Sequence, residues 1–161
     1  MIISELKIYN FRRFKSKDGL PGLHITFHKG LNALIGENDS GKTAVIDALK
    51  LVLLTQSNEY IRPMDDDFYK STHGEECSEI DCRITNFTQN EAKNFIEYLK
   101  FEKNGEKVEY ILELHYRAWK EGHKIFQELR VGDVDDSVSI DGKARDLLKA
   151  VYLKPLRDAK R

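Results

Sequence analysis

The stretch Leu31-Asn32-Ala33-Leu34-Ile35-Gly36-Glu37-Asn38-Asp39-Ser40-Gly41-Lys42-Thr43 decides the fold of this chain. Its last eight residues match the pattern G-x-x-x-x-G-K-[ST] of a phosphate-binding loop, or P-loop. The five residues before the loop are an apolar run typical of a buried strand in a parallel sheet. Residues 44–54 after it are nearly all apolar, as expected for a buried helix. A P-loop between a strand and a helix predicts a site for a nucleoside triphosphate.

The chemistry of the loop predicts a role for each of its residues. Gly36 and Gly41 let the backbone curl, so that successive N–H groups face the phosphates at the positive end of the following helix. Lys42 is expected to reach the β- and γ-phosphates, and the Thr43 hydroxyl to bind the Mg²⁺ that bridges them. Because no guanine-reading motif is present, ATP is the favoured nucleotide. The remaining residues of the predicted site are Asn38, Asp39 and Ser40.

Composition excludes some classes of protein. The 161 residues suit one domain, and 26 basic against 27 acidic residues give no overall basic bias toward nucleic acid. Residues 1–30 and 141–161 are locally basic, which suits either a phosphate-facing edge or an ordinary solvated surface. Cys77 and Cys82 are too few for a zinc site and are predicted to be plain thiols. No apolar stretch reaches about 20 residues and no signal-peptide core is present, so a cytoplasmic location is expected.

Residue periodicity predicts a largely antiparallel set of strands around the loop. Residues 1–9 and 23–27 alternate as an antiparallel pair, Thr88-Gln89-Asn90-Glu91 predicts a helix start, and Asn104-Gly105 predicts a hairpin turn. The fold class is therefore α/β, a P-loop domain with a mostly antiparallel β layer inserted after the first helix. Further strands are expected at residues 80–84, 108–116, 125–131, 138–140 and 151–153. An Asp141-Gly142 turn and a helix through Leu147 and Leu148 are expected after the strand at 138–140, and residues 56–76 are expected to form a loop.

Two parts of the chain resemble known ATPases. The first part resembles the amino-terminal half of ABC-type ATPase heads of the SMC and RecF group. It consists of residues 6–14, which contain an Asn-Phe-Arg segment, and residues 31–43, which carry Asn two places after the first glycine of the P-loop. Residues 65–69 and 151–159 resemble segments of OLD-family (overcoming lysogenization defect) ATP-dependent endonucleases, whose ATPase head precedes a Toprim nuclease domain. The resemblance spans essentially the whole chain and implies ATP and Mg²⁺ as cofactors and DNA as a partner of the full-length protein.

The resemblance also adds candidate residues outside the P-loop. It places Arg12 beside the nucleotide, where a guanidinium would pair with phosphate oxygens, although an exposed arginine at a strand edge is the open alternative. It places Arg157 in a loop that senses the γ-phosphate, with a surface salt bridge as the alternative. The carboxylates of Asp65–Asp67 are of a type that binds divalent cations. The three are consecutive, however, and lack the alternating spacing of ligands in a calcium loop, which favours an ordinary solvated loop.

Several parts of an ABC-type ATPase are not found in residues 1–161. Hydrolysis needs an apolar strand that ends in Asp, a catalytic Glu beside it and a signature segment that completes the partner's site. None of these occurs in the sequence, nor does a Toprim-like set of acidic residues, so no catalytic residue is assigned. Residues 1–161 are therefore expected to be an amino-terminal lobe that associates with the rest of its ATPase domain or with a second copy.

Three functions remain open at this point. The first is the ATP- and Mg²⁺-binding lobe of an OLD-like ATP-dependent DNA endonuclease, hydrolysis-deficient in isolation and serving DNA repair or defence. The second is a head fragment of a RecF- or SMC-like DNA-repair ATPase without nuclease activity. The third is a truncated P-loop binding module that works through a partner.

Overall fold

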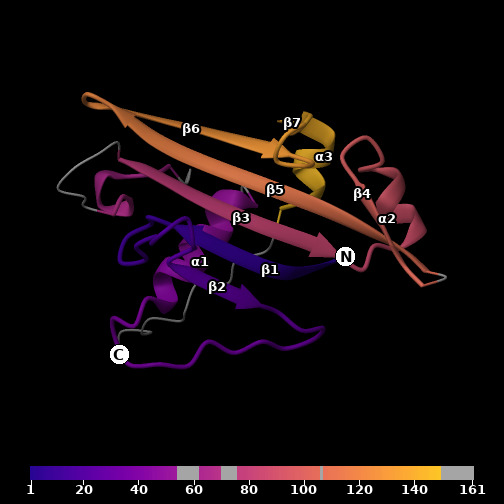
Figure 1. Cartoon of the computed structure of the whole chain (residues 1–161), viewed down its shortest axis with the longest axis horizontal. Helices are drawn as coiled ribbons and strands as arrows, with labels where there is room; N and C mark the ends of the chain where they lie inside the picture. Colours follow the sequence, from indigo (N-terminus) through magenta and orange to yellow (C-terminus); the bar gives the residue numbers. More distant parts are fainter. Residues whose placement is uncertain (54–61, 70–75, 106, 150–161) are drawn as a thin grey trace, which may run out of the picture.

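The computed structural model describes residues 1–53, 62–69, 76–105 and 107–149, which form one antiparallel sheet with a helix against one face (Figure 1). The helix is α1 (Lys42–Val52), and its first two residues, Lys42 and Thr43, are the last two of the P-loop. The sheet has the strand order β2-β1-β3-β5-β6-β7, and β4 also pairs with β5. The strands are β1 (Ile2–Tyr9), β2 (Leu23–Thr26), β3 (Cys77–Thr85), β4 (Lys100–Asn104), β5 (Lys107–Glu121), β6 (Lys124–Val131) and β7 (Val138–Ser139).

Strand β1 joins the two halves of the sheet. Leu6 pairs with Ile25 of β2 on one side and with Cys82 of β3 on the other, both antiparallel. The hairpin that precedes the P-loop and the strands that follow α1 are therefore one continuous sheet. The prediction of antiparallel strands at residues 1–9 and 23–27 is confirmed, but the later strands are not a separate layer.

Alternating side chains place the core between the sheet and α1. The fully buried residues of β1 are Leu6 and Ile8, and α1 buries Ala48 and Val52 against the same face. Removal of this apolar surface from water is the main stabilising contribution. The other strands contribute Ile80, Cys82, Ile84, Leu112, Leu114, Tyr116, Ala118, Leu129 and Val131.

Two short helices begin at polar caps. In α2 (Gln89–Lys93) the Thr88 hydroxyl accepts from the Glu91 N–H, and the Glu91 carboxylate accepts from the Thr88 N–H, so the predicted helix start is confirmed. In α3 (Gly142–Leu147) the Asp141 carboxylate accepts from two backbone N–H groups. Asp141 is thus a helix cap rather than the first residue of the expected turn.

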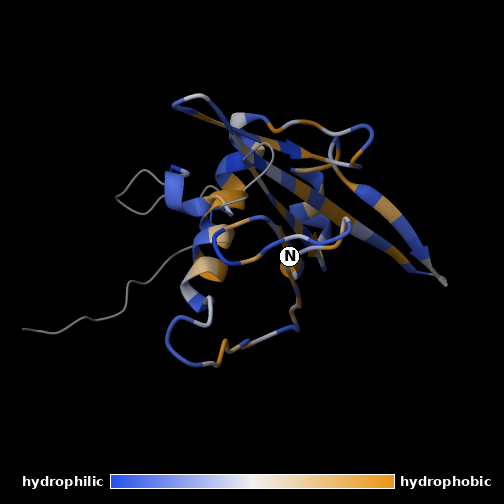
Figure 2. Cartoon of the chain, turned by 60° about the vertical axis from the view of Figure 1, so that its left-hand side comes forward, coloured by the Kyte–Doolittle hydropathy of each residue, from blue (hydrophilic) through white to orange (hydrophobic). Residues whose placement is uncertain are grey.

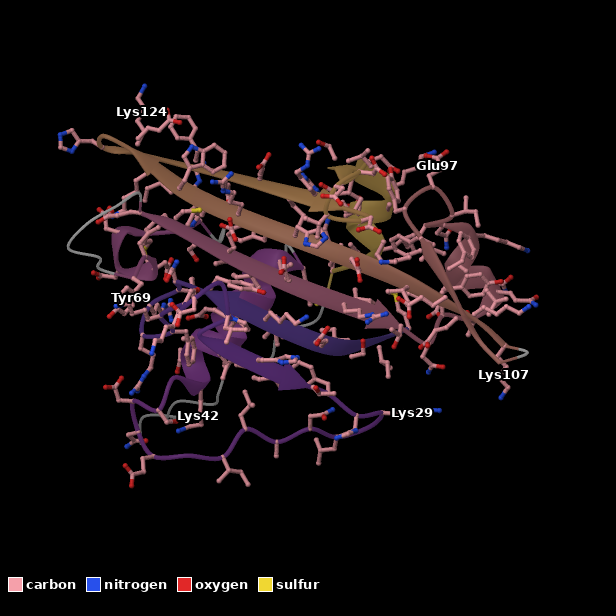
Figure 3. All side chains as sticks on the ribbon, viewed as in Figure 1. Lys29, Lys42, Tyr69, Glu97, Lys107 and Lys124 are labelled. Atoms are coloured by element: carbon pink, nitrogen blue, oxygen red, sulfur yellow. The ribbon has the colours of Figure 1, made fainter. Side chains whose placement is uncertain are left out.

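The predicted strand at Leu31–Ile35 is wrong in this structure. These residues are extended but pair with no described strand, and Leu31 and Ile35 are 98% and 93% exposed. Figure 2 shows this hydrophobic run set apart from the sheet, and Figure 3 shows it crossing from Lys29 to Lys42. A parallel strand is buried only when neighbours flank it, and every pairing in the described sheet is antiparallel.

The expected loop at 56–76 is partly outside the described residues, since 54–61 and 70–75 are not described. Within it, η1 (Asp65–Asp67) is a 3-10 turn, and Asp67 is only 4% exposed. The interpretation of this acidic trio as wholly solvated is therefore wrong for Asp67. The predicted strand at 151–153 and Arg157 also lie outside the described residues. Among the helices described, none has the length and apolar character needed to cross a membrane.

Candidate functional site

The P-loop curls around the ammonium group of Lys42. The Lys42 Nζ donates to the carbonyl oxygens of Gly36 at 2.7 Å and Glu37 at 2.6 Å, and lies 3.4 Å from the Ser40 Oγ. Asp39 and Gly41 adopt left-handed backbone conformations, with φ of 66° and 96°. A lysine inside a curled loop is what the sequence pattern predicts for a phosphate site.

The start of α1 is open to an anion. Its N-cap residue, Gly41, has no side chain to bond the first amides, and no other side chain that the structure describes caps them. The first turn also lacks an acidic residue. The positive end of the helix and its unpaired N–H groups therefore favour a bound anion at Lys42 and Thr43.

A tight turn packs directly on the P-loop. Phe11 and Phe14 exchange two backbone hydrogen bonds, at 3.2 and 2.9 Å, so that Arg12 and Arg13 form the tip. A Cβ added to Gly41 would lie 2.7 Å from the Phe14 ring and 3.1 Å from the Arg13 Cδ. Gly41 is therefore required for two reasons, its positive φ and this close approach.

Arg12 is held between two carboxylates from distant parts of the chain. Its Nε donates to Asp67 and its Nη1 donates to Asp47 of α1, each at 2.8 Å. Lys50 contacts the other Asp47 oxygen at 3.1 Å. Burial alone lowers the pKa of the Arg12 guanidinium, but its hydrogen bonds to Asp67 and Asp47 outweigh burial and raise that pKa above its usual range. Arg12 thus links the Phe11–Phe14 turn to α1 and to η1.

A cavity of about 250 Å³ lies where the turn, the loop and the helix meet. Its lining carries three cationic side chains, Arg12, Arg13 and Lys42, against the single carboxylate of Asp39. The residues present fit a nucleotide's phosphates, because positive charge, a helix start and a curled loop converge there. Six of the eight predicted site residues line this cavity: Arg12, Asn38, Asp39, Gly41, Lys42 and Thr43. The other two, Gly36 and Ser40, contact the Lys42 ammonium.

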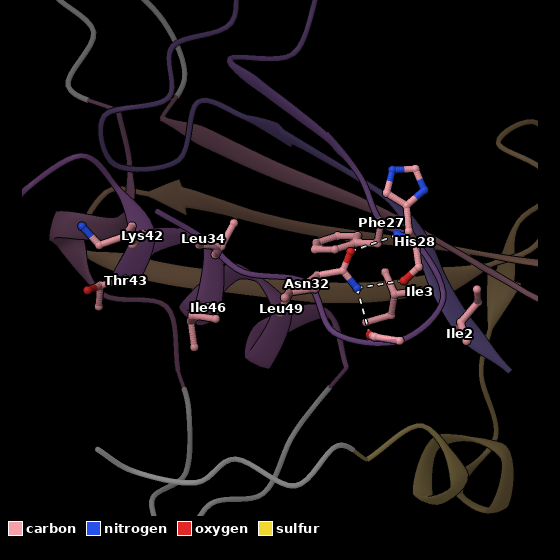
Figure 4. Close-up of a pocket in the computed structure, with 11 residues that line it drawn as sticks. Ile2, Ile3, Phe27, His28, Asn32, Leu34, Lys42, Thr43, Ile46 and Leu49 are labelled. Atoms are coloured by element: carbon pink, nitrogen blue, oxygen red, sulfur yellow. Dashed lines mark hydrogen bonds between the residues drawn. The ribbon is translucent and has the colours of Figure 1, made fainter. Parts of the chain in front are cut away.

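A larger and mainly apolar groove of about 780 Å³ runs along α1 (Figure 4). Ile46 and Leu49 of α1 line it together with Ile3 and Phe27, and Leu34 of the extended run faces it. The expectation of a helix buried on nearly every side is therefore only partly met, because this face of α1 borders the groove. Lys42 and Thr43 line both this groove and the smaller cavity, so the two adjoin at the P-loop.

Sequence reasoning missed Asp47 and Asp67 as parts of this site. They lie 35 and 55 positions from Arg12, and no local pattern connects such separations. The neighbouring Asp65 pairs with Lys120 of β5 at 2.9 Å. Among the described residues no group of three or more His, Cys, Asp or Glu side chains could hold a metal ion.

Comparisons with known proteins agree with this geometry. A family model described as an AAA domain matches residues 5–150. The chain is 30% identical over 115 residues to the DNA double-strand break repair Rad50 ATPase of Pyrococcus abyssi, covering 65% of this chain and 12% of that protein. It is 36% identical over 58 residues to the DNA replication and repair protein RecF of Streptococcus suis, covering 36% of this chain and 14% of RecF. It is also 36% identical over 62 residues to the chromosome partition protein Smc of Chlorobaculum tepidum, covering 38% and 5%. The chain therefore spans only a small share of these relatives.

Proposed function

Since this chain belongs to the AAA domain family and resembles the ATPases of the SMC and RecF group, we propose that it is a lobe that binds ATP and Mg²⁺. One observation carries the proposal. The Lys42 ammonium lies inside the curled P-loop at the uncapped start of α1, in a cavity with a surplus of positive charge. Nucleotide phosphates are the anions that suit such a site.

The residues of the loop divide the work of binding. Lys42 would exchange its contacts with the Gly36 and Glu37 carbonyls for the β- and γ-phosphates. The backbone amides of Lys42 and Thr43, at the start of α1, would donate to the phosphate oxygens, and the Thr43 hydroxyl would bind Mg²⁺. Bound Mg²⁺ neutralises phosphate charge. The described residues supply binding and positioning, and we assign no residue to the activation of water.

We further propose that residues 1–161 form the amino-terminal lobe of an ABC-type head. Support comes from the exposed Leu31 and Ile35 and from the apolar groove beside α1. Such surface is costly to leave in water, so the rest of the ATPase domain or a second copy would cover it. Light scattering with size-exclusion chromatography should detect self-association of this chain at high concentration. A clean monomer with no tendency to associate would count against coverage by a second copy.

The proposed biological setting is work on DNA by an SMC- or RecF-like repair ATPase. It is supported by the names of the relatives, which include DNA double-strand break repair, DNA replication and repair, and chromosome partition. A nuclease output is a second candidate, favoured by the likeness of residues 65–69 and 151–159 to OLD-family segments. Cleavage of DNA by the full-length protein with ATP would favour the nuclease, whereas DNA binding without cleavage would favour the repair head.

Titration with a fluorescent ATP analogue and Mg²⁺ tests the binding proposal. The wild-type chain should bind saturably, and Lys42→Ala should abolish binding because the loop loses its central cation. Lys29→Ala is the matched control, since it removes the same charge from an exposed position at the far end of the extended run (Figure 3). Equal binding by wild type and Lys42→Ala would refute the proposed site.

A further inference from the structure

The two arginines at the tip of the Phe11–Phe14 turn have different surroundings. Two nitrogen atoms of Arg12 are committed to the carboxylates of Asp47 and Asp67. The Arg13 side chain is exposed and makes no hydrogen bond or ion pair with any residue that the structure describes. Arg13 therefore keeps its whole fork of N–H donors available to a ligand.

The stem of Arg13 lies at the phosphate end of the site. Its Cδ is 3.1 Å from the point where a Cβ on Gly41 would stand, and Gly41 is the N-cap of α1. Arg13 also lines the cavity that Lys42 and Thr43 share. A guanidinium carried on this stem reaches the region that the first amides of α1 face.

The turn that presents Arg13 is firmly anchored. Phe11 is 1% exposed, and the backbone N–H of Arg12 donates to the Asp67 carbonyl at 2.8 Å. The Arg12 guanidinium adds its two carboxylate contacts to the same anchor. Because the backbone is already fixed, Arg13 loses less conformational freedom on binding than a residue of an unanchored loop would.

We propose that Arg13 contacts the phosphates of the bound nucleotide, and that Arg12 is the positioning residue that fixes the turn presenting it. The inference rests on the proposed nucleotide site. It divides the two functions between neighbouring residues according to their contacts: Arg12 is paired inside the protein, and Arg13 lines the cavity with no side-chain partner in the described part of the chain. A guanidinium suits this task because its planar donors match two phosphate oxygens at once.

Calorimetric titration with two ligands tests the proposal: ATP·Mg²⁺, and tripolyphosphate with Mg²⁺, which has no base or sugar. Arg13→Gln should weaken binding of both by about tenfold, the effect expected for one charge-assisted hydrogen bond at a partly exposed site. Arg13→Lys should fall between wild type and Arg13→Gln, because it keeps the charge but loses the fork. Lys17→Gln removes an equal charge from an exposed position outside the cavity, and should change binding of either ligand by less than about twofold.

The possible outcomes separate this inference from the proposed function. Loss of ATP affinity without loss of tripolyphosphate affinity in Arg13→Gln would overturn it, because the contact would then be to the base or sugar. An equal loss in Lys17→Gln would overturn it as well, since the effect would be one of net charge. If Arg13→Gln binds like wild type while Lys42→Ala does not bind, only this inference fails. If wild type binds neither ligand, both fail. An unchanged urea midpoint should confirm that Arg13→Gln folds.

Discussion

Replacing Arg12 by glutamine should destabilise the fold as well as the site. The substitution leaves the Asp67 carboxylate, whose side chain is 6% exposed, with the Met64 N–H at 2.9 Å as its remaining hydrogen-bond donor among the described residues. Removing one partner of a buried ion pair lowers the free energy of unfolding by about 3–5 kcal/mol. Removing one partner of an exposed ion pair lowers it by about 0–1 kcal/mol. The Arg12–Asp67 pair lies between these limits because the Arg12 side chain is 28% exposed, and the Asp47 carboxylate keeps Lys50. We therefore expect a loss of about 3 kcal/mol in the free energy of unfolding.

Urea unfolding followed by circular dichroism measures this loss from the shift in midpoint at constant slope. In the double variant Arg12→Gln/Asp67→Asn, no buried charge remains unpaired, so the double should lose less than the sum of the two single variants. Arg83→Gln is the control, since it removes an exposed pair to Glu102 at 2.9 Å and should cost no more than about 1 kcal/mol. A loss of less than about 0.5 kcal/mol for Arg12→Gln, or strict additivity in the double variant, would refute the anchoring role of this network.

Three further predictions concern other parts of the molecule. Gly41→Ala should lower the free energy of unfolding by about 2 kcal/mol or more and weaken ATP binding, because φ is 96° and a Cβ would meet the Phe14 ring; an unchanged urea midpoint would contradict it. Burial raises the pKa of the Cys82 thiol to about 12, so iodoacetamide should label it only on unfolding, as mass spectrometry would show. The hydrogen bond to Asp81 raises the pKa of His115 above its usual 6.5, so its stabilising contribution should be complete below about pH 6.5 and lost as pH rises through the raised value. Urea midpoints across this range should show that dependence in wild type and not in Asp81→Asn.

The local parts of the fold were predictable from the sequence. The alternation of Leu6 and Ile8 and the Thr88–Glu91 cap each depend on residues close together in the chain. A hairpin does join β4 and β5, but the predicted turn residues are shifted by one, because Asn104 still pairs with Lys107 in the ladder. The P-loop is likewise a contiguous pattern, and the helix it predicts begins within its last two residues. Such signals are reliable because the interactions behind them form within a few residues.

The remaining features depend on distant contacts. The run at Leu31–Ile35 has the composition of a buried strand, but composition does not supply the neighbouring strands that bury it. Arg12 is joined to Asp47 and Asp67 across 35 and 55 positions, so its partners could not be inferred from its neighbours. The sequence predicted Arg12 as a member of the site, and the structure adds its two carboxylate partners and brings Arg13 to the same cavity.

The most direct test of the account is a nuclear magnetic resonance titration of the labelled chain with ATP·Mg²⁺. The account predicts saturable shifts of the backbone amides of residues 38–44 and of Arg13, with little change at the far hairpin around Gly122. The same titration with Lys42→Ala should leave these amides unshifted. Shifts that cluster away from the P-loop, or that persist in Lys42→Ala, would contradict the claim that this loop is the nucleotide site.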